Sequence, residues 1–119
     1  MHPATTVILA ITATANIGIA VADVTRARFV LANSAEVHVP ESWLPRLAAL
    51  KAAGGVGLLL WFAGVPVLPI AAAIGLTFFF IGALIAHIRA RVFYNVAFPG
   101  AYLALAVACL TLLLIKPHV

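Results

Sequence analysis

Four long apolar stretches, separated by short polar links, constrain this chain more than any other feature. A helix needs about 20 predominantly apolar residues to cross a bilayer. We expect transmembrane helices over residues 5–24, 43–64, 67–88 and 96–115. Of the 119 residues, 66% are hydrophobic and only 8% are charged, whereas a soluble domain carries about 25% charge. Residues 1–119 are therefore expected to form one all-α integral membrane domain, a four-helix bundle in up-down-up-down order.

The first apolar stretch could be a retained helix or a removed signal peptide. Ala20 and Ala22 precede Asp23 in the way that small residues precede a cleavage site. A signal peptide also begins with a basic segment, and neither Lys nor Arg precedes this stretch. We therefore expect a retained transmembrane helix.

The basic residues between the stretches predict the orientation of the chain. Arg26, Arg28 and Arg46 lie at the link between the first two stretches, and Arg89 and Arg91 lie between the last two. The short turn between the second and third stretches contains neither Lys nor Arg. Cytoplasmic loops carry an excess of Lys and Arg. We therefore expect a multi-pass cell-membrane protein with both termini outside the cytoplasm.

Lys51 lies deeper in its stretch than anchoring at the membrane interface requires. It is about eight residues, or about 12 Å, inside the second stretch, and an isolated Lys near the bilayer centre costs roughly 2.5–3.5 kcal/mol. Its long side chain could instead reach back to the interface, so a functional and an anchoring interpretation both stay open. Glu41 and Arg46 mark the interface. Gly54, one turn beyond Lys51, allows close approach of another helix or a ligand.

The first stretch carries a polar stripe. Thr5, Thr12, Asn16 and Asp23 recur at intervals of seven and four residues, so they share one helical face. Such a stripe should face protein or a water-filled cavity. Asn16 alone is explained by a hydrogen bond between helices, but the whole stripe favours a polar pocket. Asp23 is the expected partner of Lys51.

The remaining candidates lie on the third and fourth stretches. His87 lies within one turn of the interface, where it could act as an acid or base or be an ordinary interface histidine. Tyr102 is expected to hydrogen-bond into the bundle, and Cys109 is expected to be a buried, inert thiol. No other histidine lies inside a predicted span, so no metal site is expected. The few, scattered basic residues argue against nucleic-acid binding.

Three segments and a Pro-containing turn occur together in this chain. The segments are "VPESWLPRLAALKAAGGVGLLL", "FFFIGALIAHIRAR" and "FPGAYLALAVACLTLLL". Over about residues 10–114 the chain resembles the DoxX-like family of small four-helix membrane proteins. That resemblance implies the fold. The family takes its name from a subunit associated with a thiosulfate:quinone oxidoreductase, and other relatives resemble redox-complex partners or chaperones. No active-site residue follows from the resemblance.

Two functions of different classes are compatible with these residues. The first is a binding or accessory protein that holds a small lipophilic molecule, such as a quinone, or docks onto a membrane redox complex. The second is an enzyme that performs acid–base chemistry, isomerisation or ring opening, on a small lipophilic substrate. A bundle without a ligand is a third interpretation, and small-residue seams favour a homo-oligomer. The candidate acid–base residues are Asp23, Lys51 and His87, and the candidate ligand-binding residues are Thr12, Asn16, Arg46, Gly54 and Tyr102.

Overall fold

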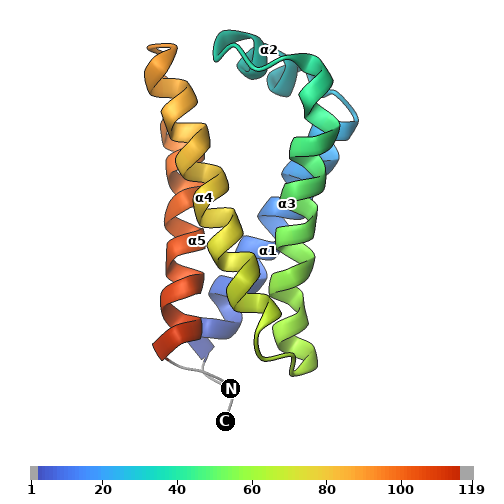
Figure 1. Ribbon diagram of the computed structural model, residues 1–119, viewed down its shortest axis with the longest axis vertical. Helices are drawn as coiled ribbons and strands as arrows, with labels where there is room; N and C mark the ends of the chain where they lie inside the picture. The colour runs from blue at the N-terminus through green and yellow to red at the C-terminus, as the bar shows by residue number, and fades with distance from the viewer. Residues whose placement is uncertain (1–2, 116–119) are drawn as a thin grey trace.

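The structure, a computed structural model, describes residues 3–115 as an elongated bundle of helices, with no strand in that range (Figure 1). Four long helices run side by side, and a short helix crosses one end of the bundle. The helices in chain order are α1 (Pro3–Val24), α2 (Arg28–Glu36), η1 (Glu41–Trp43), α3 (Leu44–Leu59), η2 (Leu60–Ala63), α4 (Leu68–Arg89) and α5 (Ala97–Ile115).

The four predicted membrane spans are confirmed as long apolar helices. They cover Pro3–Val24, Glu41–Ala63, Leu68–Arg89 and Ala97–Ile115, close to the expected limits. The second span is continuous through η1, α3 and η2, and it ends where Gly64 adopts a φ of 81°. Pro69 lies in the first turn of α4, where a missing amide hydrogen leaves no helical hydrogen bond unmade.

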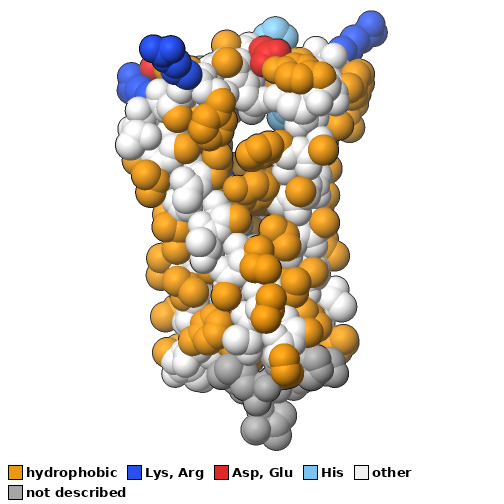
Figure 2. All heavy atoms as spheres, turned by 180° about the vertical axis from the view of Figure 1, so that it is seen from behind, with side chains coloured by type: hydrophobic (Ala, Val, Ile, Leu, Met, Phe, Trp, Pro, Cys, Tyr) orange, Lys and Arg blue, Asp and Glu red, His pale blue; other side chains and the backbone are white. Residues whose placement is uncertain are grey.

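The four spans form a ring in chain order. The α1 helix packs against α3 and α5, and α4 packs against the same two helices. Successive spans run antiparallel, as the sequence predicts (Figure 1). The charged and histidine side chains visible in Figure 2 gather at one end of the bundle, which is the end that α2 crosses.

The buried apolar core lies in the half of the bundle away from α2. Leu9 and Ala13 come from the first half of α1, Leu58 from the second half of α3, and Leu76 from α4. Cys109 of α5 belongs to the same cluster and is fully buried, as predicted. The helices are therefore tightly packed at one end only.

Glycines on α3 bring that tightly packed end together. A Cβ placed on Gly54 would lie 2.5 Å from the Leu76 side chain, and a Cβ on Gly57 would lie 2.6 Å from the Ala72 Cβ. The expected close approach at Gly54 is therefore made by a helix, since Leu76 belongs to α4. By contrast, a Cβ on Gly75 or Gly82 of α4 would meet no atom within 4 Å, so neither glycine is used for packing within the described chain.

The link between the first two spans contains a helix that sequence reasoning missed. The α2 helix has only nine residues, and its N-cap, Ala27, makes no side-chain hydrogen bond. A segment of that length with no polar cap carries little helical signal. Its buried residues are Val30 and Ser34, so it packs with one face toward the bundle.

Helices α1, α2 and α4 each end in a left-handed residue that is not glycine. Arg26, His38 and Arg91 have φ values of 54°, 62° and 57°. The Ala27 amide donates to the Ala22 carbonyl at 3.0 Å, and the Val92 amide donates to the His87 carbonyl at 2.9 Å, which closes each helix end. A basic residue near a helix C-terminus is favourable because it faces the negative end of the helix dipole.

Gly57→Ala is expected to destabilise the bundle by about 1–3 kcal/mol, because the Ala72 Cβ is fixed to its backbone and cannot move aside without shifting α4. The matched control is Gly75→Ala, which meets open space and should be neutral or more stable by up to about 1 kcal/mol. Unfolding in detergent micelles measures both. Equal stability of the two variants would contradict the close approach of α3 and α4.

Candidate functional site

A cavity of about 720 Å³ occupies the half of the bundle below α2. Pockets for drug-sized ligands fall in the range of about 300–1,000 Å³. Residues of α1, α2, α3, α4 and α5 line this cavity, and α2 covers the end that faces away from the core. Leu50 of α3 and Phe78 of α4 line the cavity and are also exposed, so it opens sideways between those helices. Figure 2, which views the bundle from the side opposite to that of Figure 1, shows a recess between apolar side chains.

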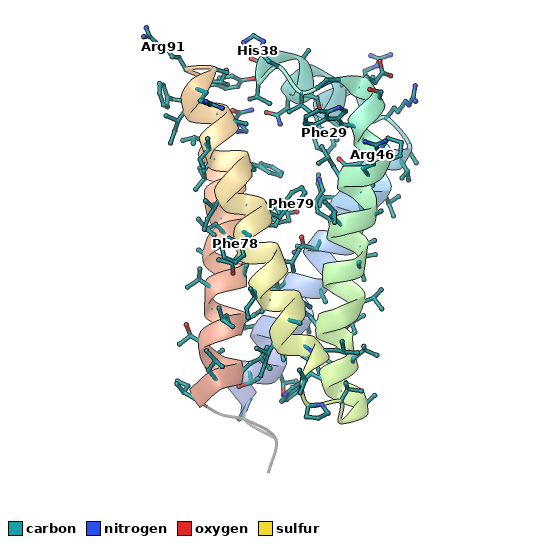
Figure 3. All side chains as sticks on the ribbon, in the orientation of Figure 1. Phe29, His38, Arg46, Phe78, Phe79 and Arg91 are labelled. Atoms are coloured by element: carbon teal, nitrogen blue, oxygen red, sulfur yellow. The ribbon has the colours of Figure 1, made fainter. Side chains whose placement is uncertain are left out.

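Aromatic side chains form much of the cavity wall. The Phe79 and Phe80 rings meet edge to face with their centroids 5.0 Å apart, and Phe80 lies 5.1 Å from Tyr102. Phe98 stacks on Tyr102 at 5.7 Å. Phe79 points into the space between α4 and α3, and Phe29 of α2 lies at its covered end (Figure 3). Such a wall favours a flat, apolar ligand group.

The cavity wall contains a buried ion pair. Lys51 Nζ lies 2.5 Å from Asp23 Oδ2, and the two side chains are only 10% and 4% exposed. Lys51 Nζ also lies 5.5 Å from the centroid of the Phe79 ring. The predicted partnership of Asp23 with Lys51 is confirmed. Each charge makes the burial of the other tolerable in a low-dielectric site.

His87 lines the same cavity and is 3% exposed. Its Nδ1 lies 3.0 Å from the Ala83 carbonyl oxygen, which can only accept, so Nδ1 carries the proton and donates. In the neutral ring, Nε2 therefore has a free lone pair. This buried atom has no hydrogen-bond partner among residues 3–115.

Tyr102 also reaches the cavity, whereas the other ligand-binding candidates do not line it. The Tyr102 hydroxyl donates to the Ala15 carbonyl at 3.2 Å, which confirms its predicted bond into the bundle. Thr12 and Asn16 are buried deeper, where Asn16 Nδ2 donates to the Thr12 carbonyl at 2.9 Å. Arg46 is exposed. The structure thus brings Asp23, Lys51, His87 and Tyr102 together and leaves Thr12, Asn16, Arg46 and Gly54 outside the cavity lining.

Two contacts that sequence reasoning missed hold α2 over the cavity. Tyr94 donates its hydroxyl hydrogen to Glu36 Oε1 at 2.5 Å, and Asn95 Nδ2 donates to Asn33 Oδ1 at 3.0 Å. The partners are 58 and 62 residues apart in the chain, so no local pattern joins them. The sequence contained one indication of these contacts. The link between the first two spans and the link between the last two were both expected at the same end of the bundle.

These features define a multi-pass membrane protein, a four-helix bundle with a laterally open apolar cavity and a charged end. The sequence model of the DoxX-like family matches residues 6–109. The chain belongs to the DoxX-like family. The matched range contains all the residues named above as lining the cavity. No curated protein and no solved structure matches the chain.

Removal of one partner of the ion pair is expected to destabilise the protein strongly. Lys51→Met should cost about 3–5 kcal/mol, because Asp23 would remain buried without a counter-charge. Asp23→Leu combined with Lys51→Met should recover most of that loss, since no buried charge remains. Chemical unfolding in detergent micelles measures both. A double variant less stable than Lys51→Met would show that the pairing is not what stabilises these residues.

Glu36→Gln is expected to lower the pKa of Tyr94. The hydrogen bond to Glu36, burial and the Glu36 charge all raise that pKa above its ordinary value of 10.0. Because the neutral phenol is the bonded form, this contact is complete below about pH 10 and is lost as the pH rises through the raised pKa. Tyrosinate absorbance in a Tyr102→Phe background reports Tyr94 alone, because the chain has 2 tyrosines. An unchanged titration in Glu36→Gln would contradict the contact.

Proposed function

We propose that this protein binds a small lipophilic or quinone-like molecule in the cavity below α2. The observation that carries the proposal is a buried ion pair, Asp23–Lys51, on the wall of an otherwise apolar and aromatic cavity. Ligand pockets combine such walls with a few well-placed polar groups. The apolar part of the ligand would contact the phenylalanines, and its polar group would face Lys51 and His87.

A purely structural bundle gives no reason for this arrangement. Protein interiors are close-packed, and unfilled space in a core destabilises it. Tight packing at one end of this bundle shows that the helices can approach closely. At the other end, a buried charge pair replaces packed apolar side chains. A bound molecule accounts for both the space and the polar groups.

The position of the site in the membrane follows from the charged end. Arg26, Arg28, Arg46, Arg89 and Arg91 all lie at the links on the α2 side. We propose that this side is cytoplasmic, with both termini on the other side. We propose in addition that copies of the chain form a homo-oligomer, as the small-residue seams of the sequence predict. In an accessory role, this protein would present its bound molecule to a membrane redox partner.

Acid–base catalysis on the bound molecule is the second candidate. It is favoured by the meeting of Asp23, Lys51 and His87 around one cavity. Isomerisation or ring opening needs only two or three titratable groups around a dry pocket. Conversion of a bound substrate that is lost in both Asp23→Asn and Lys51→Met variants, measured under conditions in which these destabilised variants remain folded, would select this candidate over binding alone.

The binding role is tested by identifying what co-purifies with the protein. Ala86→Phe places an aromatic ring inside the cavity, so a bound lipophile measured by mass spectrometry should fall about tenfold. Ala71→Phe is the matched control, since Ala71 is exposed on the same helix and does not line the cavity. Visible absorption detects a quinone directly. Equal bound content in wild type and Ala86→Phe, or no bound lipophile in either, would count against the proposal.

A further inference from the structure

We infer that the cavity selects an uncharged, ring-bearing amphiphile whose head carries both a hydroxyl group and a hydrogen-bond acceptor. This inference rests on the proposed binding function and defines its ligand class. A molecule with acceptors only, such as an oxidised quinone or an aryl ether, should bind more weakly than its hydroxyl-bearing counterpart. The inference depends on charge balance, on the hydrogen bonds still available at two buried side chains, and on the shape of the wall.

Charge balance excludes ionic ligands. Asp23 and Lys51 neutralise each other at 2.5 Å, and both are buried. Glu36, the other charged residue among the described lining residues, is exposed and accepts a hydrogen bond from Tyr94. An anionic head would have to take Lys51 from Asp23, and a cationic head would have to take Asp23 from Lys51. Either exchange leaves a buried charge without its partner, which is strongly unfavourable.

Lys51 supplies the donor side of the site. An ammonium group has three N–H donors, so an ion pair with the single oxygen Asp23 Oδ2 leaves donors for a ligand. The ammonium also lies over the Phe79 ring, which fixes it against the aromatic wall. A ligand carbonyl or hydroxyl oxygen could therefore accept a charge-assisted hydrogen bond from Lys51 without displacing Asp23.

His87 supplies the acceptor side. Because its Nδ1 proton is committed to the Ala83 carbonyl, the neutral ring presents Nε2 only as an acceptor. Nε2 is buried and has no partner among the described residues, and an unsatisfied buried polar atom is unfavourable. A ligand hydroxyl satisfies it by donating, whereas a carbonyl or ether oxygen cannot. This atom distinguishes a quinol or phenol from a quinone.

The wall defines the shape of the ligand head. The Phe80, Tyr102 and Phe98 rings follow one another at centroid distances of 5.1 and 5.7 Å. A flat ring can continue this series. The sideways opening beside Leu50 and Phe78 leaves room for an apolar tail to extend toward the lipid. The resulting ligand is a hydroxylated ring with a second oxygen and an apolar tail.

Three probes with one tail length test the inference. Octyl para-hydroxybenzoate has a hydroxyl and a carbonyl, octyl para-methoxybenzoate has no donor, and para-octyloxybenzoate is an anion. Affinity is measured by calorimetry on protein in lipid nanodiscs, with empty nanodiscs subtracted to remove partitioning. The hydroxyl probe should bind wild type about tenfold more tightly than the methoxy probe, and the anion should bind least.

Two substitutions at His87 test whether this residue distinguishes the hydroxyl probe from the methoxy probe. His87→Phe keeps a flat ring and removes the acceptor, so the ratio between hydroxyl and methoxy probes should fall to about one. His87→Gln retains an acceptor and should keep a larger ratio than His87→Phe. The Asp23→Leu, Lys51→Met double variant should weaken both uncharged probes and leave their ratio unchanged, since His87 is intact.

The outcomes separate this inference from the proposed function. Equal binding of hydroxyl and methoxy probes to wild type overturns the inference and leaves lipophile binding in place. Tightest binding of the anion overturns it as well, because Lys51 would then act as a free cation. If His87→Phe keeps the wild-type ratio of affinities for the hydroxyl and methoxy probes, the inference is also overturned. If no probe binds and no lipophile co-purifies, the proposed function itself fails.

Discussion

The neutralisation of Lys51 by Asp23 is the constraint on which the charged half of this bundle depends. Neither group belongs in a membrane span alone, and each is buried against the other at 2.5 Å. The pair fixes where α1 and α3 must lie relative to each other near the polar end. It also adds no net charge to the cavity wall, so the space beside it stays apolar while it retains hydrogen-bond donors. A purely apolar wall could hold a lipophile but could not orient it.

The distribution of small residues along α3 divides the molecule into two halves. Gly54 and Gly57 contact α4 without a Cβ, so the two helices meet closely at that level. Toward α2, lysine and leucine side chains replace glycine on α3, and phenylalanines occupy the facing part of α4. Bulk on both helices keeps the backbones apart there. The packed core and the cavity therefore both follow from the change from small to large side chains along α3.

The fold was predictable because the bilayer restricts the alternatives. Span lengths, the charged end and the depth of Lys51 follow from hydropathy and helix rise, and the position of Asp23 on the polar stripe indicated its partner. The ligand-binding residues were less predictable. Thr12 and Asn16 share the face of Asp23, yet they lie at the packed level and bond within their own helix or to α5. Helical periodicity predicts which residues share one face of a helix. It does not predict which of those residues lie at the level of the cavity along the helix axis.

The parts that could not be predicted depend on contacts between distant segments. Nothing local to α2 shows that Asn33 and Glu36 meet Asn95 and Tyr94, because those bonds form only after the two links lie at the same end of the bundle. The free Nε2 of His87 was equally hidden. Its acceptor role depends on the Ala83 carbonyl one turn earlier, which fixes the tautomer only once the ring orientation is known.

The sideways opening beside Leu50 and Phe78 bears on how the proposed ligand would enter the cavity. A ligand that diffuses within the bilayer would reach this opening without passing through water, so its occupancy would follow its mole fraction among the lipids. Each methylene of a tail adds about 0.8 kcal/mol to partitioning into the membrane. Longer-tailed guests would therefore fill the site at lower aqueous concentrations without making any additional contact with the protein.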